Sequence, residues 1–148
     1  MSQPRATRPY RPPSARLIDV NSRFALFKLL NKREFGNQLE QFASEQLNQK
    51  GCEIIATNFQ CKLGEIDIIA KDGNSLVFVE VRYRKQNTFG GAGASVDQKK
   101  QTKIIKTASF YLQQQNLTNQ VACRFDVFAI EGNPQRMTYN WIKDAFSA

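Results

Sequence analysis

Two acidic residues lie inside apolar stretches that otherwise favour β-strands. Asp67 lies in the sequence EIDII, and Glu80 lies in the sequence VFVEV. Strands are rich in β-branched and aromatic residues, whereas aspartate and, to a lesser degree, glutamate are disfavoured there. Carboxylates in such positions need a cation, which is either a basic side chain of the protein or a bound metal ion.

The segment that contains both acids, residues 64–85, predicts a β-hairpin. If Asp72 and Gly73 are the two central turn residues, Glu65 lies opposite Glu80, and Asp67 is a diagonal neighbour of Glu80 at about 7–8 Å. Both carboxylates could then reach one ion. Alternation of side chains places the following charged residues on one face of the hairpin: Glu65, Asp67, Glu80, Arg82 and Arg84.

Two kinds of cation could neutralise this face. Arg82 and Arg84 could form a salt-bridge network with the carboxylates, which would be a structural role. A hard divalent ion such as Mg²⁺ is the functional alternative, because it prefers carboxylate and carbonyl oxygen and retains several waters. The spacing of the acids leaves both alternatives open.

The composition removes several classes of chemistry. The chain has no histidine, which excludes histidine general acids and bases, Ser-His and Cys-His nucleophiles and histidine-ligated metals. The cysteines Cys52, Cys61 and Cys123 are odd in number and lack CxxC spacing, so they indicate neither a disulfide framework nor a four-cysteine zinc site. No apolar run has the length of a membrane span, and the N-terminus lacks the apolar core of a signal peptide. We therefore expect a cytoplasmic protein with no membrane partner.

The net charge of +8 is concentrated near the N-terminus. Residues 1–33 contain eight basic residues and one aspartate, whereas residues 34–148 contain 13 basic and 12 acidic residues. A basic arm before a nearly neutral domain favours a polyanionic partner such as nucleic acid. The alternative is a disordered solubilising tail, since the arm is rich in proline and arginine. We predict an arm over residues 1–32, disordered at least over 1–17, and a folded domain over 33–148.

The domain shows a regular order of elements. An apolar helical stripe begins at Glu34 and ends near Gly51. The chain then predicts, in order, a strand over 52–59, the hairpin, a helix over about 97–116 and strands over 121–130 and 137–142. This αβββαβ order, with one further strand, predicts an α/β domain with a central mixed sheet flanked by helices.

Lysines of the second predicted helix are candidates for phosphate contacts. Lys99, Lys103 and Lys106 recur at i, i+4 and i+7, and Lys100 lies among them. A solvated lysine-rich face is the alternative. The preceding glycine-rich segment GGAGA lacks the Gly-Lys-Ser/Thr ending of a P-loop, and we interpret it as a flexible loop on the substrate side. A base-stacking role and simple burial are both open for Trp141.

These motifs together resemble the YraN family of bacterial predicted endonucleases. The resemblance covers about residues 33–146 and is carried by FGNQLEQFASEQLNQKG, GEIDIIAKDG, LVFVEVRYR, SVDQKKQTKI and RFDVFAI. It implies the restriction-endonuclease-like fold, related to archaeal Holliday-junction resolvases, and a Mg²⁺- or Mn²⁺-dependent endonuclease that hydrolyses phosphodiester bonds in structured, branched DNA. Arg124 and Asp126 match the family, as a structural ion pair or as part of the site. A homodimer is left open.

The resemblance also implies roles for individual residues. Asp67 takes the Asp position of the nuclease motif, and Glu80, Val81 and Arg82 take the Glu-x-Lys positions. The implied metal ligands are Asp67, Glu80, the carbonyl of Val81 and Glu40 of the first helix. Arg82 departs from the motif, because a guanidinium cannot act as a general base, although it can bind phosphate bidentately and stabilise its charge.

Two hypotheses of different class follow. One is a metal-dependent endonuclease, and the other is a catalytically inactive nucleic-acid-binding or scaffolding protein with the same fold. The residues expected to contact nucleic acid in either case are Arg84, Lys99, Lys100 and Lys103.

Overall fold

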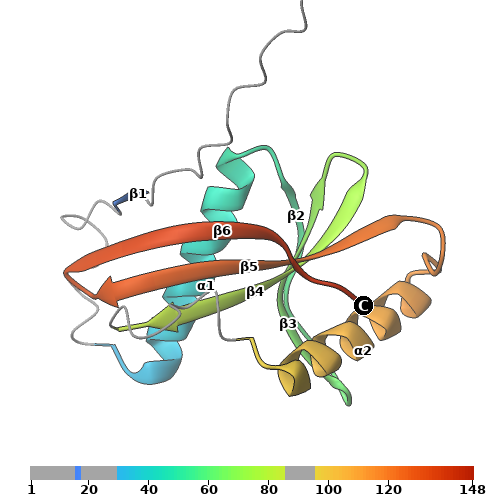
Figure 1. The fold of residues 1–148 in the computed structure, drawn as a ribbon, viewed down its shortest axis with the longest axis horizontal. Helices are drawn as coiled ribbons and strands as arrows, with labels where there is room; N and C mark the ends of the chain where they lie inside the picture. The colour runs from blue at the N-terminus through green and yellow to red at the C-terminus, as the bar shows by residue number, and fades with distance from the viewer. Residues whose placement is uncertain (1–15, 18–29, 86–95) are drawn as a thin grey trace, which may run out of the picture.

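The computed structural model describes residues 16–17, 30–85 and 96–148, and the structural statements below concern these ranges. The elements are β1 (Arg16–Leu17), α1 (Lys32–Gln49), β2 (Glu53–Cys61), β3 (Gly64–Asp72), β4 (Ser75–Arg84), α2 (Gln98–Gln114), β5 (Ala122–Asn133) and β6 (Arg136–Phe146). The predicted α/β class and the αβββαβ order with a final strand are confirmed (Figure 1). None of the described helices combines the length and apolar composition needed to cross a bilayer.

The strands form one mixed sheet in the order β1-β6-β5-β4-β3-β2. β4 and β5 run parallel, and the other neighbouring strands are antiparallel. The prediction that residues 1–17 are disordered is wrong for Arg16–Leu17, because β1 pairs with Thr138 and Tyr139 of β6. Backbone pairing along an exposed sheet edge requires no apolar pattern, which explains why the composition did not indicate it.

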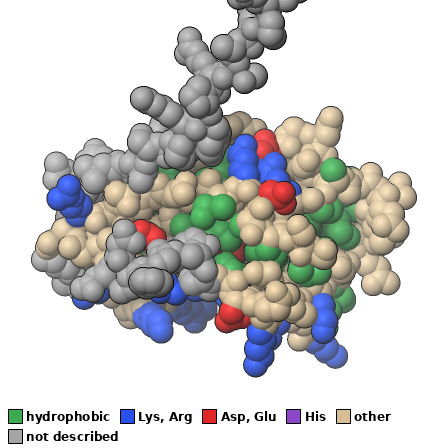
Figure 2. Space-filling model, viewed as in Figure 1, with side chains coloured by type: hydrophobic (Ala, Val, Ile, Leu, Met, Phe, Trp, Pro, Cys, Tyr) green, Lys and Arg blue, Asp and Glu red, His purple; other side chains and the backbone are tan. Residues whose placement is uncertain are grey.

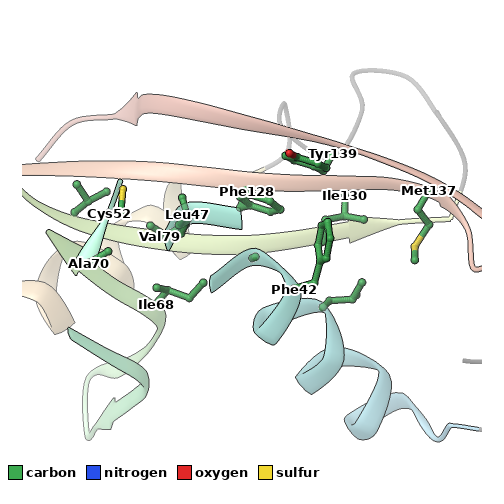
Figure 3. Packing of buried hydrophobic residues seen from close by; sticks show 13 residues of the cluster. Phe42, Leu47, Cys52, Ile68, Ala70, Val79, Phe128, Ile130, Met137 and Tyr139 are labelled. Carbon is green, nitrogen blue, oxygen red and sulfur yellow. The ribbon is translucent and has the colours of Figure 1, made fainter. Parts of the chain in front are cut away.

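The two helices cover opposite faces of the sheet. Asn31 caps α1 and exchanges capping-box hydrogen bonds with Glu34, so the helix begins at Lys32, two residues before the predicted start. Figure 3 shows Phe42 of α1 directed toward β5, where Phe128 and Ile130 belong to the same buried cluster. On the other face, α2 packs its own buried side chains into a second cluster. The sheet is therefore held between two cores, which fixes both helices relative to the strands.

The β3–β4 hairpin turns one residue later than predicted. Asp72 pairs with Ser75, so Gly73 and Asn74 are the central turn residues. Gly73 has a φ of +60°, as the first central position of a type II′ turn requires. The predicted register was therefore wrong. Moving the turn by one residue preserves which side chains share a face, but it places residue 67 directly opposite residue 80 instead of diagonal to it.

The sheet divides at the point where these two residues lie. Pairing between β3 and β4 ends at Ile68 and Val79, so Asp67 and Glu80 are the first residues beyond the ladder. In Figure 1, β2 and β3 turn away from β4, β5 and β6 and run toward α2. Alternation with the buried Ile69 and Phe78 places both acids on the α2 face. We call this region the fork.

Candidate active site

The fork brings together the two acidic residues that are unusual for strands. Asp67 and Glu80 are 8% and 4% exposed, and a hydrogen bond links their carboxyl groups. Asp67 Oδ2 also accepts a hydrogen bond of 2.8 Å from the backbone N–H of Val81. Since the β3–β4 ladder has ended, a side-chain carboxylate provides the acceptor for this strand N–H. We call Asp67 and Glu80 the carboxyl pair.

The environment of the carboxyl pair disfavours two negative charges. Burial and the charge of Glu80 together raise the pKa of Asp67 to about 8, although the hydrogen bond from the Val81 N–H opposes the rise. Near neutral pH and without a bound metal ion, Asp67 therefore retains its proton. A perturbed carboxyl of this kind, buried with a specific charged partner, is typical of functional sites.

Glu40 of α1 approaches the carboxyl pair from the opposite helix. Burial raises the pKa of Glu40, a hydrogen bond with Asn58 lowers it, and the charges of Glu65 and Glu80 raise it. Its Oε2 atom is buried and has no hydrogen-bond partner among the described residues. Buried carboxylate oxygens normally have a donor or a cation, so this atom indicates a missing positive partner.

A lysine of α2 contacts the carboxyl pair directly. Lys100 Nζ lies 2.8 Å from Glu80 Oε1. Burial lowers the pKa of Lys100, but the hydrogen bond and the charge of Glu80 outweigh this and leave its pKa above the ordinary value. Arg82 lies close enough to act against the Lys100 charge. The basic side chain that pairs with Glu80 therefore comes from helix α2. The sequence suggested Arg82 and Arg84 of the strand as the possible basic partners.

The donor chemistry of the site fits a hard divalent cation. Asp67, Glu80 and Glu40 offer carboxylate oxygens, which Mg²⁺ and Mn²⁺ prefer. The unpartnered oxygen of Glu40 and the retained proton of Asp67 both mark places where positive charge is lacking. Within the described ranges, no three His, Cys, Asp or Glu side chains are already arranged to hold a metal ion. A metal would therefore have to draw Glu40 and the carboxyl pair together.

The other predicted contact residues surround this site at different depths. Arg84 is half-buried near the end of β4, whereas Lys99 and Lys103 are exposed on α2. Figure 2 shows basic side chains projecting at the lower edge of the molecule, where α2 lies in Figure 1. Val81 contacts the carboxyl pair through its backbone N–H, which donates to Asp67. The GGAGA segment and most of the N-terminal arm lie outside the described residues.

Arg124 and Asp126 form a separate ion network on the α1 face of the sheet. Asp126 is fully buried and accepts two hydrogen bonds from Arg124, of 2.8 and 2.9 Å. It also accepts from Trp141 Nε1 and from the backbone N–H of Asp144, at 2.8 and 2.9 Å. Arg124 binds Asp72 as well, at 2.9 Å. We call these residues the Arg124 network, and its saturated hydrogen bonding is that of a structural ion pair.

Two contributors were not found from the sequence. The sequence predicts Asn58 only as part of a strand. Its φ is +51°, which asparagine tolerates better than most residues, and nothing in the sequence except the residue type indicates this conformation. Lys100 was identified as a phosphate contact but not as the partner of Glu80. Its position between Lys99 and Lys103 gave no indication that it alone faces the fork.

The chain is similar in sequence to members of one protein family. The model of the uncharacterised protein family UPF0102 matches residues 39–130. A UPF0102 protein of Pseudomonas savastanoi pv. phaseolicola is 44% identical over 119 residues, covering 80% of this chain and 97% of that protein. A UPF0102 protein of Hahella chejuensis is 46% identical over 121 residues, covering 81% and 95%. A UPF0102 protein of Vibrio parahaemolyticus is 42% identical over 119 residues, covering 80% and 97%.

Proposed function

The chain belongs to the UPF0102 family, which is the YraN family that its motifs resemble, and on this premise we propose that it is a divalent-metal-dependent endonuclease. Its proposed substrate is structured DNA such as a branched duplex. The observation that carries the proposal is the carboxyl pair: two buried acids in contact, with Asp67 kept protonated when no metal ion is bound. Burying two acids side by side lowers the stability of the fold unless a cation compensates their charge, and such pairs are typical of functional sites.

The proposed metal site consists of Asp67, Glu80, the carbonyl of Val81 and Glu40. Bound Mg²⁺ or Mn²⁺ would activate water and neutralise charge on the phosphodiester. The protein residues then orient the site. The Val81 N–H holds Asp67 Oδ2 in place, and Asn58 holds Glu40.

The basic residues around the fork would bind the DNA backbone. Arg82 follows the carboxyl pair on β4 and can bind a phosphate bidentately, stabilising the charge that develops during hydrolysis. Arg84, Lys99 and Lys103 would contact phosphates farther from the cleaved bond. Such contacts carry shape and charge information but little base sequence, which suits a structured substrate.

A second function is favoured by one observation. The ion pair between Lys100 and Glu80 already neutralises one acid without a metal ion. A protein that kept the fold as a nucleic-acid-binding scaffold could retain this pair for stability. The scaffold hypothesis gives no account of Glu40 Oε2 or of the proton on Asp67, and the endonuclease is therefore the function that we propose.

A cleavage assay distinguishes the two functions. Branched, nicked and single-stranded DNA and RNA are incubated with the protein and Mg²⁺, Mn²⁺ or chelator. The wild type should cleave a branched duplex only with metal, and Asp67→Asn and Glu80→Gln should each lose about 100-fold or more of this activity. Glu53→Gln removes an exposed carboxylate of β2 and serves as the matched control. Metal-independent binding without cleavage in every condition would support the scaffold.

A further inference from the structure

One lysine of α2 is set apart from its neighbours by depth and by contact. Lys99, Lys103 and Lys106 are exposed, whereas Lys100 is half-buried and its ammonium lies 2.8 Å from Glu80 Oε1. The Lys100 side chain is still 41% exposed, while Glu80 is 4% exposed. The ammonium therefore lies at the boundary between the carboxyl pair and solvent, where a phosphate group would have to approach.

The position of Lys100 is fixed by the fold. Asp97 caps α2, and its Oδ1 accepts a hydrogen bond of 2.7 Å from the backbone N–H of Lys100. Farther along, α2 packs tightly on the start of β3: a Cβ at Gly64, which has a φ of +151°, would lie 2.9 Å from Thr107 Oγ1. This close approach places the first turn of α2 beside the fork. The contact with Glu80 thus follows from helix docking and not from the reach of a long side chain alone.

Lysine and arginine would do different work at this site. Lys100 carries a compact ammonium with three rotatable donors, which can bind a carboxylate and a phosphate oxygen at the same time. Arg82 carries a planar guanidinium group, which matches phosphate geometry but whose donors cannot rotate independently. Arg82 is also close enough to Lys100 for their charges to oppose each other. The site therefore contains both kinds of cation, one from β4 and one from α2.

We propose that Lys100 supplies, from α2, the ammonium that a Glu-x-Lys motif would place at position 82, and that it contacts the phosphate at the cleaved bond. The inference rests on the endonuclease function proposed above. In this structure the Lys100 ammonium forms an ion pair with Glu80. If the carboxylates held a divalent ion, the Lys100 ammonium would be available to a phosphate, while the Lys100 backbone would stay fixed by Asp97.

The test moves the lysine between the two positions. Lys100→Gln should lower the cleavage of branched DNA by about 100-fold. The control Lys143→Gln removes the same charge from an exposed position on the side of the Arg124 network and should change cleavage by less than about 5-fold. The double variant Lys100→Gln/Arg82→Lys, which restores an ammonium at the motif position, should recover at least about 10-fold over Lys100→Gln. Thermal unfolding of each variant shows whether it is folded.

A second readout does not depend on cleavage. Calorimetric titration with Mn²⁺ should show tighter binding to Lys100→Gln than to wild type, because the ammonium no longer competes for Glu80. Lys143→Gln should bind Mn²⁺ as wild type does. Equal Mn²⁺ affinities in the two single variants would overturn the inference that Lys100 shares the carboxylates with a metal.

The cleavage outcomes separate the two proposals. If wild type cleaves and Lys100→Gln is as active as Lys143→Gln, the inference fails while the endonuclease proposal stands. A double variant no more active than Lys100→Gln would also overturn the assignment to the motif position. If wild type cleaves nothing in Mg²⁺ or Mn²⁺, the endonuclease proposal fails, and the role of Lys100 in cleavage fails with it.

Discussion

Asp126 of β5 and Asp67 of β3 are both buried carboxylates of one sheet, at 0% and 8% exposure, but their partners differ in kind. Asp126 receives two hydrogen bonds from the Arg124 guanidinium and further ones from Trp141 and the backbone of Asp144. Asp67 receives one backbone hydrogen bond and otherwise meets another acid, Glu80. One carboxylate is saturated with donors, and the other lacks them.

The pKa values follow the same contrast. Within the Arg124 network, hydrogen bonding to Arg124 lowers the pKa of Asp72. At the fork, burial and the charge of Glu80 together raise the pKa of Asp67 to about 8. A buried carboxylate that serves stability is surrounded by donors, because its charge must be compensated within the protein. A carboxylate that binds an external cation is not fully compensated by donors of the protein. This difference in compensation distinguishes the proposed functional site from the structural ion network.

Removing the central cation of the Arg124 network should have the largest effect on the free energy of unfolding. Arg124→Met leaves Asp126 buried without its main partner, so we expect a loss of about 3–5 kcal/mol in the free energy of unfolding, measured by urea denaturation. Lys143→Gln removes an exposed cation that also contacts Asp72, at 3.3 Å, and should cost less than about 1 kcal/mol. A similar small loss for Arg124→Met would contradict the structural role of the Arg124 network.

The fork should reveal itself through the pH dependence of stability. The pKa of Asp67 is raised in the folded state, so the folded protein binds its proton more tightly than the unfolded chain does. The resulting stabilisation is complete below about pH 4, the ordinary aspartate pKa, and is lost as the pH rises toward 8. We expect the metal-free protein to lose up to about 1 kcal/mol per pH unit in this window.

Asp67→Asn should flatten this slope, since the amide does not titrate. Urea denaturation at pH 5, 6, 7 and 8 in chelator measures it. The matched variant Asp72→Asn alters a carboxyl whose pKa is lowered. It should lower stability by a constant amount between pH 5 and 8, where the wild-type carboxylate stays charged, and should leave the slope in this window unchanged. An unchanged slope in Asp67→Asn would show that Asp67 does not hold the proton.

Divalent ions should sharpen the comparison, because the proposed metal ligands lie at the fork and not in the Arg124 network. At about 10–100 times the dissociation constant, Mn²⁺ should add about 1–3 kcal/mol to the stability of the wild type. The gain should be larger at pH 8 than at pH 6, since the metal competes with the Asp67 proton. Thermal unfolding with and without Mn²⁺ measures this gain. Asp67→Asn should lose most of it and Lys143→Gln should keep it; equal gains in both variants would place the metal elsewhere.

The smallest effect concerns DNA affinity. If α2 faces the substrate, Lys99→Gln/Lys103→Gln should reduce the slope of log affinity against log salt by about 1–2, because each lost phosphate contact contributes about 0.9. Lys143→Gln, on the side of the Arg124 network, should leave the slope unchanged. Fluorescence anisotropy with a branched duplex in chelator measures both. A slope that falls equally in the two variants would mean that DNA does not distinguish these surfaces.

Much of the fork was predictable because its determinants are local. Period-two alternation placed Asp67 and Glu80 on one face, and this survived an error in the turn. The segment KDGNS allows a two-residue turn at either Asp72-Gly73 or Gly73-Asn74, and the two choices differ by a whole pleat, so every side chain keeps its face. The distance between the two acids did change, because it depends on the register itself.

The amino-acid sequence by itself determined the order of the two helices and of strands β2 to β6, which side chains share a strand face, and which acids are out of place there. These properties depend on neighbours a few positions apart. The partners of the acids were decided only by tertiary structure. Lys100 reaches Glu80 and Glu40 reaches the carboxyl pair because α1 and α2 dock on opposite faces of a sheet that divides between β3 and β4. The contact between Lys100 and Glu80 depends on how closely a helix packs against a strand, and no spacing along the chain encodes that distance.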